Sequence, residues 1–143
     1  MGEEKELSTS DKLEIAFAKE RKDISSYIQN HITNNMGSIE NIADVQVHIL
    51  SKRQILVDKS NEMRAGIRKR SKNIASMRKS KYRFYKTEFD LKLSDYEITR
   101  HIDADVEETV NLIKMIENQI VFYKETIDGL DKCTYMIKYL IEY

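Results

Sequence analysis

The chain has 143 residues, of which 41% are hydrophobic and 34% are charged, and its formal net charge is zero. It has no proline and only four glycines, so it lacks most of the turn residues that an all-β or doubly wound fold requires. No apolar run approaches the roughly 20 residues that a membrane-spanning helix needs. We therefore expect an all-α protein with one helical domain over residues 1–143 and no membrane segment.

The cysteine content and the first ten residues indicate where the protein works. A single cysteine, Cys133, cannot form a disulfide within the chain. The first ten residues are polar and acidic, unlike a signal peptide or an amphipathic transit sequence. We therefore expect a cytoplasmic protein.

The first predicted element is an N-terminal helix within residues 1–37. The polar run at residues 8–10 is typical of a helix N-cap, and Asp11 follows in the first turn, where a carboxylate is favoured. Two asparagines and Gly37 break the helical pattern, so we expect the helix to end there.

A long basic helix is predicted next, over residues 38–86. Ser38 offers an N-cap, and Glu40 lies where a carboxylate interacts favourably with the helix dipole. Apolar residues then recur at seven-residue intervals, which predicts one buried stripe that contains Ile42, Ile49, Leu56 and Met63.

A connection and a third helix complete the predicted order of elements. Residues 86–94 alternate apolar and polar side chains, which predicts a short extended connection. Ser94 and Glu97 form the capping-box pattern that begins a helix. We therefore expect a C-terminal helix over residues 94–143.

The C-terminal helix carries the clearest periodicity in the chain. From Val106 to Ile141, apolar residues follow a spacing of three and four that is typical of a coiled-coil seam, and a second ladder from Leu112 to Leu140 runs beside it. A helix with two adjacent seams can face two neighbours, so we expect an oligomeric helical bundle or ring. The predicted oligomer contacts are Ile113, Ile116, Ile120, Tyr123, Ile127, Leu130, Ile137 and Ile141.

Charge is strongly segregated along the chain. Residues 64–87 hold ten basic and no acidic side chains, whereas residues 1–63 and 88–143 carry net charges of −3 and −7. Crowding like charges on one helix costs stability, which indicates an anionic partner. We favour nucleic acid, and the alternatives are an acidic protein surface, including that of another subunit, and a plain solvated face.

The candidate binding residues lie in the basic helix. Basic side chains neutralise phosphates, and aromatic rings stack on unpaired bases whatever the base sequence, so single-stranded DNA suits the combination. The rings of Phe84 and Tyr85 have a second interpretation, in which they pack the end of the helix into the core. The candidate nucleic-acid-binding residues are Arg68, Lys69, Lys72, Arg78, Lys79, Lys81, Tyr82, Arg83, Phe84, Tyr85 and Lys86.

No pattern in the chain indicates an enzyme. Gly66 is not followed by the spacing of a phosphate-binding loop, and the three histidines lack the spacing of metal ligands. Asp103 and Asp105 diverge by about 200° on a helix, which does not suit a shared metal ion. Cys133 lies on an apolar seam, as a core thiol does. We therefore expect no catalytic residue, no metal site and no cofactor.

One stretch of the basic helix resembles a known family. Residues 77–87, MRKSKYRFYKT, are similar to the basic helix of the UvsY recombination mediators of T-even-like phages, which ends in a basic-x-basic step before two aromatic residues. The residues that occupy those places here are Lys79, Lys81, Phe84 and Tyr85.

The resemblance extends over roughly residues 64–143. It includes residues 102–105, IDAD, which are similar to an Asp-containing helix start of the family, and the closing stretch at residues 134–143, TYMIKYLIEY. The chain departs from the family at Thr87 and Glu88, where a small residue and a glycine are usual. The resemblance does not extend to the N-terminal half, so it implies nothing about contacts that the family makes through that region.

The resemblance implies a function based on binding. It implies a ring-forming homo-oligomer that binds single-stranded DNA, helps to displace the phage single-strand-binding protein and loads a RecA-like recombinase in recombination and repair. The alternative is a helical scaffold or adaptor whose basic face docks on an acidic protein.

Overall fold

The computed structural model describes residues 7–142, and in that part of the chain it consists of helices and loops without a strand. The all-α prediction is therefore confirmed. Residues 1–6 and Tyr143, which belong to the predicted N-terminal segment and C-terminal helix, lie outside the described residues. The elements are α1 (Thr9–His31), the 3-10 helices η1 (Thr33–Asn35) and η2 (Ile39–Asn41), α2 (Ile42–Thr87) and α3 (Asp95–Glu142).

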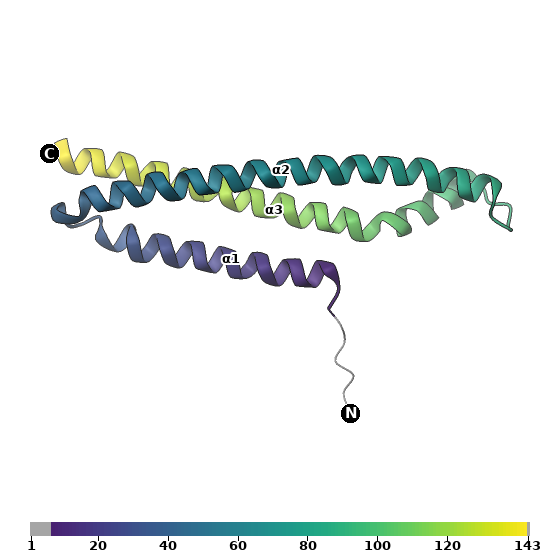
Figure 1. Ribbon diagram of the computed structural model, residues 1–143, viewed down its shortest axis with the longest axis horizontal. Coiled ribbons are helices and arrows are strands. Elements are labelled where there is room, and N and C mark those ends of the chain that lie inside the picture. Colours follow the sequence, from purple (N-terminus) through teal and green to yellow (C-terminus); the bar gives the residue numbers. More distant parts are fainter. Residues whose placement is uncertain (1–6, 143) are drawn as a thin grey trace, which may run out of the picture.

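The two longest helices, α2 and α3, run antiparallel along almost the whole length of the molecule (Figure 1). Ion pairs between them show the register, because the residue number falls in α3 as it rises in α2. Arg53 pairs with Asp131 at 2.9 Å near one end, and Lys86 pairs with Asp95 at 3.2 Å near the other.

Helix α1 covers only part of this pair (Figure 1). It packs against α2 and α3 at the end where α3 finishes, and its first turns reach Ile67 of α2 and Met115 of α3 through Leu13 and Phe17. The molecule thus has a three-helix base and a two-helix arm, which we define as residues 68–114. The arm contains most of the basic segment.

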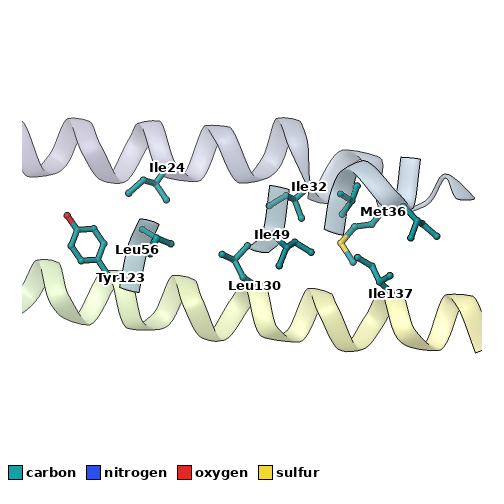
Figure 2. Packing of buried hydrophobic residues seen from close by; sticks show 10 residues of the cluster. Ile24, Ile32, Met36, Ile49, Leu56, Tyr123, Leu130 and Ile137 are labelled. Atoms are coloured by element: carbon teal, nitrogen blue, oxygen red, sulfur yellow. The ribbon is translucent and has the colours of Figure 1, made fainter. Parts of the chain in front are cut away.

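The seam that the sequence predicts on α3 is buried inside the chain. Tyr123, Leu130 and Ile137 of α3 pack against Ile49 and Leu56 of α2. Ile24 of α1 and Ile32, which directly follows α1, belong to the same core (Figure 2). Within the described chain, the apolar seam of α3 therefore packs against α2 and α1. The seven-residue stripe predicted on α2 forms the other side of this core.

A polar network joins all three helices in the base. The buried amide of Gln119 in α3 accepts a hydrogen bond from Arg21 of α1 at 2.8 Å and donates to the carboxylate of Glu20 at 3.0 Å. The Tyr123 hydroxyl donates to the same carboxylate, and Lys59 of α2 pairs with it at 3.1 Å. A buried polar group needs its partners, so this network favours one register of the helices over its neighbours.

The start of α2 differs from the sequence prediction. The predicted boundary at residues 37 and 38 is replaced by an irregular turn: α1 ends at His31, two 3-10 helices follow, and α2 begins at Ile42. The predicted N-cap was wrong, because Ser38 makes no side-chain capping bond and precedes η2. Burial of Ile32 and Met36 under the end of the base explains why the chain turns early.

The connection between α2 and α3 also differs from the prediction. Helix α2 continues to Thr87, and residues 88–94 form a loop rather than an extended segment. The amides of Glu88 and Phe89 both donate hydrogen bonds to the carbonyl of Phe84, so the backbone turns at the end of α2. An isolated extended segment has no neighbouring strand to bond, which explains why the alternating pattern does not produce one.

Two predicted helix starts are confirmed. The Ser8 hydroxyl accepts a hydrogen bond from the Asp11 amide at 3.1 Å and caps α1. Ser94 and Glu97 form the capping box of α3, in which the Glu97 amide donates to the Ser94 hydroxyl at 3.2 Å and the Glu97 carboxylate accepts from the Ser94 amide at 3.4 Å. Within residues 7–142, no helix combines the length and apolar character that crossing a membrane requires.

We predict that Leu130→Ala lowers the free energy of unfolding by about 2–5 kcal/mol, because its side chain is buried between the helices of the base. The matched control is Leu50→Ala, since Leu50 is exposed on α2 and should cost less than about 0.5 kcal/mol. Urea denaturation of both variants measures the difference. Equal losses would mean that the seam on α3 is not packed within the chain as described.

Candidate nucleic-acid interface

The basic helix of the arm has one face that points away from α3. The side toward α3 carries half-buried residues at seven-residue intervals, namely Ile67, Ile74 and Lys81. Because a helix turns about 100° per residue, positions about half a turn away from these face solvent. We call the exposed basic residues on this far side the outer stripe, and they are Arg68, Lys69, Lys72, Lys79 and Arg83.

The outer stripe has no carboxylate close enough for an ion pair within residues 7–142. No acidic residue occurs between residues 64 and 87, so the helix itself supplies no counter-charge. The positive potential of the stripe is therefore open to an external anion.

Three other basic residues of α2 in the arm pair with aspartates of α3. Arg78 pairs with Asp103 at 2.8 Å, and Lys81 lies 3.5 Å from Asp105. Lys86 completes the row at the tip through its pair with Asp95. The structure thus divides the predicted basic residues into two groups, one facing solvent and one paired with aspartates on the flank next to α3.

The aromatic residues at the tip are also divided. Tyr85 donates a hydrogen bond to Asp105 at 2.7 Å, and its ring stacks on His101 at a centroid distance of 5.2 Å. Tyr82 donates to Asp95 at 3.2 Å. Phe84 contacts the rings of Tyr85 and Phe89 edge-on, yet 43% of it is exposed. Packing therefore accounts for Tyr85, while part of the Phe84 ring faces solvent.

These contacts shift the proton affinities of the groups at the tip. The hydrogen bond to Asp105 raises the pKa of Tyr85. The hydrogen bonds from Lys86 and then Tyr82 lower the pKa of Asp95. The hydrogen bonds with Asp95 and then Tyr82 raise the pKa of Lys86. All three shifts favour the charge states in which the carboxylates of α3 hold their partners at neutral pH.

The aspartates of α3 are the part of the site that sequence reasoning missed. The sequence analysis considered Asp103 and Asp105 only as metal ligands, but they pair with two different basic residues of α2. The signal was present in the order of charges, because antiparallel helices joined by a short loop bring residues equally far from that loop together. Asp95 and Lys86, each within two residues of the loop, are the simplest case.

The predicted oligomer contacts do not form a free surface. Ile116, Ile120, Tyr123, Leu130 and Ile137 are buried within the chain, and Ile113 and Ile127 are half-buried. Ile141 is exposed. The apolar side chains that do face solvent at this end of α3 are Tyr135, Met136, Tyr139, Leu140 and Ile141.

Two of the three histidines and the cysteine lie in the base rather than in the arm. His31 and His48 stack at 4.9 Å in the base, where the Tyr27 hydroxyl lies 2.6 Å from Nδ1 of His48. Among residues 7–142, no three histidine, cysteine, aspartate or glutamate side chains are placed to hold a metal ion. Cys133 packs against the core, and burial raises the pKa of its thiol, which disfavours the reactive thiolate.

Comparison with known protein families, with curated proteins and with solved structures finds no match for this chain. Its functional interpretation therefore depends on the residues of the arm and their geometry.

We predict that Lys86→Met raises the pKa of the Asp95 carboxyl toward its ordinary value, because it removes the main group that lowers it. A carboxyl with a lowered pKa stabilises the fold above its unfolded pKa, and this contribution disappears as the pH falls through the folded value. An NMR titration of the side-chain carboxyls measures the shift. Lys92→Met, a change in the loop, is the control, and an Asp95 pKa that stays low in Lys86→Met would contradict the pairing.

Proposed function

We propose that the protein binds single-stranded DNA through the outer stripe of α2. The observation that carries this proposal is the stripe itself, in which five exposed basic residues share one side of a rigid helix without a described carboxylate partner. Phosphates that bind there release counterions, which favours binding at low salt. From Arg68 to Arg83 the stripe spans about 22 Å, at about 1.5 Å per residue.

Exposed rings near the stripe favour a single strand over a duplex. Tyr82 and Phe84 are each more than 40% exposed at the tip, next to Arg83. Aromatic stacking on an unpaired base contributes about 1–3 kcal/mol and requires no particular base. Bases in a duplex are stacked on one another, so they offer no free face to these rings.

The resemblance of residues 64–143 to the UvsY mediators suggests the biological role. On this proposal the protein acts by binding rather than by catalysis, and it helps to load a RecA-like recombinase onto DNA coated with the phage single-strand-binding protein. The outer stripe includes Lys79, one of the residues that carry the resemblance. The oligomer implied by the resemblance would use a surface other than the buried seam of α3.

The exposed apolar end of α3 is the surface that suits self-association. Five large apolar side chains in the last nine residues are exposed, as described above, and apolar groups gathered at one end of a molecule mark an interaction site. This end lies at the base, at the far end of the molecule from the tip of the arm (Figure 1). Association there leaves the outer stripe free for DNA.

The first test of the DNA site removes charge from the stripe. We predict that Lys72→Ala with Lys79→Ala weakens binding to a single-stranded oligonucleotide and flattens the salt dependence by about 1.4 in log–log slope, at about 0.7 per lost phosphate contact. Fluorescence anisotropy across a range of salt concentrations measures both effects.

The control for this test is Lys114→Ala with Lys124→Ala, which removes the same charge from exposed positions on α3. A simple net-charge effect treats the two pairs alike, and that result would argue against the stripe. Absence of any salt-sensitive DNA binding, together with binding to an acidic protein, would favour the adaptor function instead.

The second test concerns assembly. We predict that Leu140→Glu with Ile141→Glu lowers the mass measured by light scattering to that of a monomer without loss of helix, because both side chains are more than half exposed. Leu91→Glu with Tyr96→Glu places the same charges on exposed residues at the tip of the arm and should leave the mass unchanged. A wild-type protein that is monomeric at micromolar concentration would rule the proposal out.

A further inference from the structure

We infer that Asp95, Asp103 and Asp105 of α3 compete with DNA phosphates for three basic residues of the arm. Because they already pair with these residues, they limit the affinity of the site for DNA. This inference rests on the proposed DNA binding and adds its regulation. It concerns three basic residues that do not belong to the outer stripe, namely Arg78, Lys81 and Lys86.

The chemistry of the three pairs is the chemistry of phosphate recognition. A carboxylate oxygen lies 2.8 Å from the Arg78 guanidinium and 3.5 Å from the Lys81 ammonium. Carboxylates and phosphates accept charge-assisted hydrogen bonds from the same donors, so one excludes the other from a given donor. A strand that lies along the arm therefore meets three cations that are already neutralised.

Asp105 contacts two residues of α2 and is the least exposed of the three aspartates. It accepts from Tyr85 at 2.7 Å and lies beside Lys81, and its side chain is 29% exposed, the lowest value of the three aspartates. Asp95 is the most exposed of them, at 76%, so water screens its pair with Lys86 most strongly. Water therefore screens the pair of Lys81 with Asp105 least, although its distance of 3.5 Å is the longest of the three.

The arrangement gives the basic segment fewer phosphate contacts than the ten basic residues of residues 64–87 suggest. The salt dependence of binding reports the number of contacts, because each one releases counterions. The paired cations should contribute little to this slope, although they lie on the same helix as the outer stripe. Binding through the outer stripe then remains salt-sensitive and reversible. A protein that must transfer its DNA strand to a partner requires such reversible binding.

The test is the double variant Asp103→Asn with Asp105→Asn. Asparagine keeps the size of the side chain and an acceptor for Tyr85, while it removes the negative charge. Release of Arg78 and Lys81 should steepen the log–log salt slope by about 1.4 and tighten binding to a single-stranded oligonucleotide about 25-fold at 0.1 M salt. Circular dichroism confirms that the variant keeps its helix content.

The matched control is Glu107→Gln with Glu108→Gln. Both residues are exposed on α3, close to Asp105, and neither forms an ion pair with a described residue. This variant changes the net charge by the same amount, so it measures the general electrostatic effect. Its salt slope should remain that of the wild type. An equal gain in both variants would overturn the inference.

Lys81→Ala provides a second readout. In the wild type this change should leave the salt slope almost unaltered, because Asp105 already neutralises Lys81. In the Asp103→Asn, Asp105→Asn background the same change should reduce the slope by about 0.7. A loss of the same size in both backgrounds would show that Lys81 contacts phosphate in spite of Asp105, which contradicts the inference.

The outcomes separate this inference from the proposed function. If the wild type binds no single-stranded DNA, or binds it independently of Lys72 and Lys79, the proposed function fails and the inference fails with it. If the wild type binds through those lysines and the aspartate variant gains nothing over its control, only the inference fails. A gain confined to the aspartate variant supports both.

Discussion

The antiparallel packing of α2 against α3 is the interaction on which the rest of the structure depends. The basic segment of α2, residues 64–87, has ten basic residues and no acidic one, so it cannot supply its own counter-charges, and no described part of α1 reaches the tip of the arm. Apolar residues such as Ile98 and Ile102 of α3 are buried along the arm and hold the basic helix in one orientation. That orientation decides which cations face solvent and which face aspartates.

The polar network in the base fixes the register between α2 and α3, and the same register continues into the arm. Gln119 and Tyr123 converge on Glu20, so a slide of α3 by one helical turn would separate buried polar groups from their partners. The same slide would move Asp105 away from Lys81 at the tip. Packing and hydrogen bonding in the base thus determine an electrostatic pattern in the arm, through helices that are continuous between the two.

Much of the fold follows from the sequence, because its signals are local. The caps at Ser8 and Ser94 satisfy backbone groups within the same turn, and the spacing of apolar residues in α3 identifies its buried side whatever lies against it. The partner of that side was not predictable, since the same seam can pack on another subunit or on α2. The irregular start of α2 also escaped prediction, because it depends on the burial of Ile32 and Met36 in the assembled base.

The candidate site shows the same limit of sequence reasoning. The density of positive charge located the site on the basic helix, and the exposed residues of the outer stripe were all among the predicted ones. Which cations are paired depends on the register between two helices, and that register is set by contacts of the base, such as Gln119 with Phe17, about a hundred positions apart in the chain. Spacing along one helix carries no such information.

The most direct measurement is a lysine acetylation footprint of the protein with and without a single-stranded oligonucleotide, read residue by residue with mass spectrometry. DNA on the outer stripe should protect Lys69, Lys72 and Lys79 strongly, while Lys124 and Lys132 on α3 should react equally in both samples. Protection of the α3 lysines, or no protection in the arm under conditions where DNA is bound, would contradict the central claim that the outward face of α2 is the binding surface.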